Sequence, residues 1–196
     1  VRTALKLGLD RDIIVNKVKN QGDLPAYSYT PPYADGMKLT KPEWFGWSQE
    51  KRNEEARKLL EEAGYGKGKP LSFDLLYNTS DLHKKMAIAT ASIWKKNLGV
   101  NVRLQNQEWK TFLDTRHQGN YDVARAGWCA DYNEPSSFLN TMLSGSSNNT
   151  AHYQSPAFDK IIAETLKASG DEARAELYDK AEQQLDKDSV IVPVYY

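Results

Sequence analysis

The 196-residue sequence has one cysteine, no net charge and no long apolar segment, and each shortage limits the functions open to it. Its 26 basic residues balance 26 acidic ones, so overall charge gives no reason to expect nucleic acid or an anionic membrane as a partner. No apolar run reaches the roughly 18 residues that a membrane-spanning helix needs. A lone cysteine excludes a disulfide within the sequence, so Cys129 is either a reduced thiol or pairs with a cysteine outside it.

Motifs for metal and phosphate chemistry are missing as well. The three histidines, His83, His117 and His152, are not spaced as metal ligands, and neither a CxxC nor an HExxH motif occurs. A glycine-rich stretch at 64–68 follows an expected helix and precedes an expected strand, whereas a phosphate-binding loop follows a strand and precedes a helix. That stretch is therefore predicted to be a linker.

Three residues close together in the sequence carry side chains that enzymes use: Cys129, Asp131 and Glu134. No nucleophile signature accompanies Cys129, for which a structural or disulfide role is the simpler interpretation. Asp131 and Glu134 lie in an expected turn, where a salt-bridging acid and a helix N-terminal charge fit better than a glycosidase pair. The sequence therefore predicts a protein that is not an enzyme and that uses no metal or other cofactor.

Alternating helix and strand patterns predict an α/β fold. An alternating strand at 71–77, a capped helix ending near Leu98 and a strand at 100–104 form a βαβ unit, whose strands should be parallel. The remaining expected helices are 1–7, 10–18, 48–63, 108–118, 135–143, 156–167 and 171–187. A long loop at 20–46 should be held to a surface by its aromatic residues. The last expected strand, Val190–Tyr196, stops at the end of the sequence, so we expect a fragment of a longer protein.

The segment Tyr121–Phe138, YDVARAGWCADYNEPSSF, is the strongest candidate for a functional site. Its first six residues, to Ala126, alternate as a strand, and the alternation stops at Gly127, which lacks the Cβ that would keep another backbone at a distance. Trp128 and Asp131 then place an aromatic ring and a carboxylate at the strand exit. The alternative is an ordinary strand end, with Asp131 as a turn residue and Trp128 in the core.

Five segments together carry a resemblance to a known family: ALKLGLDRDIIV, EEARKLLEEAGYG, AGWCADYNEPSSFL, FDKIIAETL and AEQQLDKD. Over essentially the whole chain, the sequence resembles the periplasmic oligopeptide-binding proteins of bacterial ABC importers. The resemblance implies that residues 1–196 form a single α/β lobe of a type II periplasmic-binding-protein-like fold, with a mixed sheet flanked by helices. It also implies a periplasmic location, short peptides as ligands, and two partners, the missing second lobe and a membrane permease.

The resemblance implies roles for individual residues as well. Asp131 would pair with the α-ammonium of a peptide, and Gly127, Trp128 and Cys129 would bind the peptide backbone as an added strand. Cations at different depths would meet the C-terminal carboxylate of peptides of several lengths, and tryptophans would line roomy side-chain pockets. The matching cations are Lys19, His83, Arg116 and Arg125, and the matching tryptophans are Trp109 and Trp128. In the intact receptor, Cys129 would form a disulfide with an upstream cysteine outside this chain.

Other interpretations stay open for several of these residues. His83 and Arg116 lie in or beside expected helices and could be surface charges, whereas Arg125 needs a buried partner if it points inward. The alternative functions are those of a related receptor for a murein tripeptide, a dipeptide or nickel, or chaperone-like contacts alone. Asp131 favours a ligand with a free ammonium over nickel.

Overall fold

The computed structural model describes residues 1–196, which divide into two compact units. The first unit contains Val1–Pro25, Gly46–Ala126 and Val194–Tyr196, and the second contains Ala26–Phe45 and Gly127–Pro193. The predicted α/β class is confirmed, because a parallel sheet is flanked by helices. No helix combines the length and the apolar character required to cross a membrane. That residues 1–196 form one lobe of a larger receptor stays a prediction.

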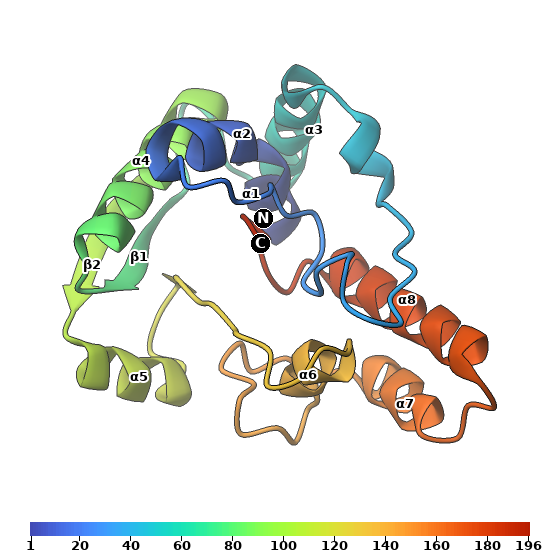
Figure 1. Ribbon diagram of the computed structural model, residues 1–196. Helices are drawn as coiled ribbons and strands as arrows, with labels where there is room; N and C mark the ends of the chain where they lie inside the picture. Colours follow the sequence, from blue (N-terminus) through green and yellow to red (C-terminus); the bar gives the residue numbers. More distant parts are fainter. The chain divides into compact units, whose positions relative to one another are not determined.

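The first unit is built around a three-stranded sheet in the order β2-β1-β3, and every pairing within it is parallel. α4 connects β1 to β2 and packs on both strands, which confirms the predicted parallel βαβ unit (Figure 1). The strands are β1 (Ser72–Asn78), β2 (Asn101–Gln107) and β3 (Val123–Ala124), and the connecting helices are α4 (Asp81–Leu98) and α5 (Trp109–Gln118). Antiparallel pairing, expected in a mixed sheet, is limited to two isolated bridges.

Two strands are much shorter than the sequence predicted. Residues 121–126 were expected to pair throughout, but only Val123–Ala124 form β3. The carboxylate of Asp122 accepts the N–H of Asp74 at 3.0 Å, so a side chain takes the donor that a longer β3 would pair with. The expected final strand Val190–Tyr196 is reduced to one bridge at Tyr195, because its first apolar residues pack on the core of the second unit instead.

Helix ends follow the capping residues in the sequence. The Ser80 hydroxyl accepts the N–H of His83 to start α4, and Gly99, at φ +70°, ends it. Likewise, the Ser48 hydroxyl accepts the N–H of Lys51 at 3.2 Å to start α3 (Gln49–Glu62). Both predicted helices are thereby confirmed to within a residue or two.

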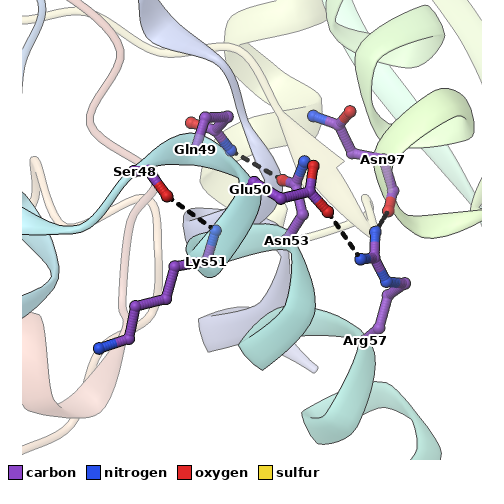
Figure 2. A network of polar contacts seen from close by, with 7 residues as sticks. All are labelled: Ser48, Gln49, Glu50, Lys51, Asn53, Arg57 and Asn97. Atoms are coloured by element: carbon purple, nitrogen blue, oxygen red, sulfur yellow. Dashed lines mark hydrogen bonds and ion pairs between the residues drawn. The ribbon is translucent and has the colours of Figure 1, made fainter.

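Polar side chains on α3 join it to the rest of the first unit (Figure 2). Gln49 Nε2 donates to Asn53 Oδ1 at 2.8 Å and to the carbonyl of Leu7 in α1 (Arg2–Gly8) at 3.0 Å. Arg57 donates to the carbonyl of Asn97 near the end of α4 at 2.9 Å. The contacts to Leu7 and Asn97 use main-chain carbonyls that the C-terminal ends of α1 and α4 leave unpaired.

The expected helix at 10–18 differs in form. It begins as the short α2 (Arg11–Ile13), with Asp10 as its N-cap, and continues as a π-helix over Ile14–Lys19. It ends at Asn20, whose backbone is left-handed (φ 48°). Asparagine tolerates this conformation because its short polar side chain can form local hydrogen bonds.

The second unit is helical, and its core lies between α6, α7 and α8. Phe158 and Leu139 are fully buried there, and α7 and α8 lie side by side (Figure 1). The helices are α6 (Ser136–Leu139), the 3-10 helix Asn140–Met142, α7 (Pro156–Thr165) and α8 (Asp171–Asp188). A further 3-10 helix spans Glu43–Gly46.

Acidic residues of α8 hold the segment 26–45, which was expected to be pinned by its aromatics. Glu182 accepts the N–H groups of Tyr29 (3.1 Å) and Thr30 (2.5 Å). Asp179 accepts the N–H of Thr40 at 2.7 Å. Two aromatics contribute as expected: the indole of Trp44 donates to Asp186 at 2.9 Å, and Tyr29 forms a hydrogen bond with the Thr141 hydroxyl (2.8 Å) and packs edge-on against Phe138. Asp179, Glu182 and Asp186 recur at helical spacing and present one row of acceptors to the loop.

Candidate functional site

The main chain of Gly127, Trp128 and Cys129 is unpaired. None of its N–H or C=O groups forms a hydrogen bond within the protein, although the preceding Arg125 N–H still donates to the carbonyl of Leu76 in β1 at 2.8 Å. Gly127 and Cys129 are exposed, and Trp128 is half-buried. A short stretch of unused main-chain donors and acceptors is what an added peptide strand requires.

After Cys129 the chain folds back onto the start of α6, and Ser137 receives it there. The indole Nε1 of Trp128 donates to the Ser137 carbonyl at 2.7 Å, and the N–H of Asp131 donates to the Ser137 hydroxyl at 2.9 Å. Ser137 itself is buried. Trp128 and Asp131 are therefore fixed to a single residue of the second unit.

The turn between Asp131 and α6 is closed by Glu134. Its carboxylate accepts the N–H of Ser136 at 2.9 Å and also the Ser136 hydroxyl. Burial, and secondly a hydrogen bond with Glu134, raise the pKa of Tyr178 to about 12. Glu134 thus serves the start of α6, as the sequence predicted.

Asp131 differs from Glu134 because its carboxylate has no partner. The side chain is exposed and makes no hydrogen bond or ion pair within the protein. The salt-bridging alternative considered for Asp131 therefore has no counterpart in the structure. An unpaired carboxylate on a fixed main chain can accept a cation from a ligand.

Two of the predicted cations meet at the carboxyl end of β1. Arg125 donates to the side-chain oxygen of Asn78 at 3.4 Å, and no carboxylate neutralises it. Burial, followed by the charge of Arg125, lowers the pKa of His83 in the first turn of α4. His83 is therefore neutral near pH 7, and Arg125 carries the positive charge at this edge of the sheet.

The other predicted residues of the first unit lie on different elements. Trp109 starts α5, is half exposed (52%) and stacks on Phe112, over which the Arg116 guanidinium also lies at 5.4 Å. Lys19 ends the π-helix and is paired with Asp23 at 2.8 Å. The charge of Lys19 is thus already balanced locally, unlike that of Arg125.

Residues 1–150 match the family model for bacterial extracellular solute-binding proteins, family 5 middle region. The chain belongs to this family. It is 83% identical, over all 196 residues, to the periplasmic oligopeptide-binding protein OppA of Salmonella typhimurium, and 47% identical to the periplasmic murein peptide-binding protein MppA of Escherichia coli. Both alignments include 100% of this chain but only 36% of the length of the relative. The structure of Haemophilus influenzae OppA in complex with RPPGFSPFR has a TM-score of 0.97, with 52% identity over 100% of this chain and 39% of that one.

Membership of the solute-binding family confirms two of the sequence-based predictions. The solved relative supports the α/β fold class, and the relatives named as periplasmic confirm the predicted location. The site residues are not tested by these similarities, so their roles stay predictions.

Within this solute-binding chain, Cys129 is exposed and is a free thiol. The predicted disulfide needs a cysteine outside these residues and also stays a prediction. No cluster of three or more histidine, cysteine or acidic residues is arranged to hold a metal ion.

The structure adds two residues that the sequence did not single out, Asn78 and Ser137. Asn78 ends β1 and is the partner that Arg125 was expected to need, although it is an amide and not an acid. Ser137 had no distinguishing signal, because it is one of two consecutive serines after Pro135. Only the fold-back of the chain shows which serine is buried.

Proposed function

We propose that this chain is the peptide-binding lobe of the solute-binding component of an ABC oligopeptide importer. The observation that carries the proposal is the unpaired Asp131 carboxylate, which follows three residues whose main chain has no partner. The 83% identity to a relative named for oligopeptide binding supports it, as does the peptide complex of a second relative. The missing second lobe and a membrane permease are the proposed partners.

A receptor for peptides of any sequence must recognise what all peptides share. Gly127, Trp128 and Cys129 supply main-chain donors and acceptors for a peptide strand, and Asp131 supplies a counter-ion for its α-ammonium. Neither contact depends on the ligand's side chains. Trp109 and Trp128 are proposed to line side-chain pockets, in which bridging water accommodates varied groups.

The ligand carboxylate requires positive charge, and Arg125 is best suited to provide it. Its guanidinium has an amide partner, Asn78, so its charge is not neutralised. Neutral His83 would act as a hydrogen-bond donor beside it, because its lowered pKa leaves it uncharged near pH 7. Arg116 and Lys19 are proposed to serve peptides of other lengths.

Calorimetric titration of the full-length receptor tests this function. Tripeptides with small, acidic and aromatic side chains should bind with affinities within about tenfold of one another, because the shared backbone and termini provide most of the free energy. The matched control is the same set blocked at both ends, which should bind at least about 100-fold more weakly. Selective binding of a murein tripeptide, of dipeptides or of nickel would replace the proposal with one of its alternatives.

Cys129 gives a separate prediction for the full-length receptor. The unreduced, denatured protein should not react with a thiol reagent, whereas the reduced protein should, and a Cys129→Ser variant should leave one new reactive thiol. The disulfide should stabilise the receptor by about 2–4 kcal/mol. Stoichiometric labelling of Cys129 without reductant would show that it is a free thiol.

A further inference from the structure

Ser137 uses all of its polar groups to hold the segment that precedes it. Its hydroxyl accepts the N–H of Asp131 at 2.9 Å, and its carbonyl accepts the Trp128 indole N–H at 2.7 Å. Its own N–H donates to the carbonyl of Glu134 at 3.0 Å. The residue is only 5% exposed, and its bonds to Trp128 and Asp131 are partly buried, so competition from water is reduced.

The Asp131 carboxylate itself is not held by any neighbour. Its position therefore depends on its main chain, and the bond to the Ser137 hydroxyl is the only hydrogen bond that the Asp131 N–H makes. If that bond were absent, the Asp131 main chain would have to be ordered when a ligand binds, and the entropy cost would reduce affinity.

We propose that Ser137 is a positioning residue, which holds the Asp131 carboxylate ready for a ligand ammonium before the ligand arrives. This inference rests on the proposed function, because it assigns a supporting group to the same site. Ser137 does not touch the ligand; it acts through the main chain of Asp131.

The chain offers well-matched variants. Ser137→Ala removes the acceptor for Asp131 but keeps the main-chain carbonyl that binds Trp128. Ser137→Thr keeps a hydroxyl at the same position. Ser136→Ala is the control, because the Ser136 side chain bonds to Glu134 and Tyr132 but not to Asp131 or Trp128.

The first measurement needs no ligand: amide hydrogen exchange in the full-length receptor. The Asp131 N–H should exchange faster in Ser137→Ala than in the wild type, while Ser136→Ala and Ser137→Thr should keep its protection. Unchanged exchange in Ser137→Ala would overturn the inference.

The second measurement is calorimetric binding of a tripeptide with a free or an acetylated N-terminus. Ser137→Ala should weaken binding of the free peptide by about three- to tenfold, as expected for one hydrogen bond, and should leave the acetylated peptide unchanged. Equal weakening of both peptides would indicate a purely structural role and would overturn the inference.

An Asp131→Asn variant in the same series separates the two hypotheses. If Asp131→Asn weakens binding of the free peptide much more than binding of the acetylated peptide, and Ser137→Ala weakens both equally or neither, the positioning role is wrong and the proposed site stands. If Asp131→Asn weakens binding of the free and the acetylated peptide equally, the proposed site falls, and the positioning role falls with it.

Discussion

Asp131→Asn should lower the affinity of the full-length receptor for a free tripeptide by about two to four decades. In the closed receptor, the proposed ion pair would be removed from water, so deleting the carboxylate charge would leave the ligand ammonium desolvated and unpaired. This loss corresponds to roughly 3–5 kcal/mol. Calorimetry on wild type and variant measures it directly.

Acetylated tripeptides complete the double-mutant cycle. They lack the positive charge, so they should bind the wild type poorly and should be much less sensitive to Asp131→Asn. Asp171→Asn is the matched control, because it makes the same change at an exposed acid in the first turn of α8. A similar loss for free and acetylated peptides would show that Asp131 does not recognise the ammonium.

Glu182→Ala should lower the free energy of unfolding of the chain by about 2–6 kcal/mol. The carboxylate is buried (4% exposed) and accepts the N–H groups of Tyr29 and Thr30, both of which the alanine would leave unpaired. Urea unfolding measures the change, with Glu176→Ala at an exposed position of α8 as the control. A loss no larger than that of Glu176→Ala would contradict the role of Glu182 in anchoring the segment 26–45.

Glu182 should also make stability depend on pH. Burial, opposed by its hydrogen bonds, raises its pKa from 4.5 to about 7, so the folded state retains a proton that the unfolded state has lost. Its contribution is therefore fully present below pH 4.5 and is lost as pH rises through about 7, by an amount on the order of 3 kcal/mol. Glu182→Gln should remove this dependence, and an unchanged pH profile in that variant would contradict the assignment.

Local signals in the sequence predicted the regular elements of the first unit well. Ser48 and Ser80 cap α3 and α4, and Gly99 ends α4, because these effects depend only on neighbouring residues. The parallel pairing of β1 and β2 followed from the helix between them. Competition between a side chain and the main chain for one hydrogen-bond donor could not be predicted in this way. The Asp122 carboxylate accepts the main-chain N–H of Asp74 in β1, and this limits the length of β3.

The sequence located the candidate site but not its supporting contacts. Tyr121–Phe138 was recognised by its loss of alternation and its dense functional side chains, and the structure shows the unpaired main chain there. By contrast, Glu182 bonds to main-chain groups of Tyr29 and Thr30, more than 150 positions away, and main-chain partners leave no mark on residue identity. Ser137 was overlooked because only its burial distinguishes it from Ser136.

Asp131 is proposed to bind the α-ammonium of a peptide, and a crystal structure of the full-length receptor with a bound tripeptide would show this pairing or its absence. The ligand nitrogen should lie about 2.7–2.9 Å from an Asp131 carboxylate oxygen, with the ligand main chain paired to Gly127–Cys129. A bound tripeptide whose ammonium contacts another group, with Asp131 facing solvent, would contradict it.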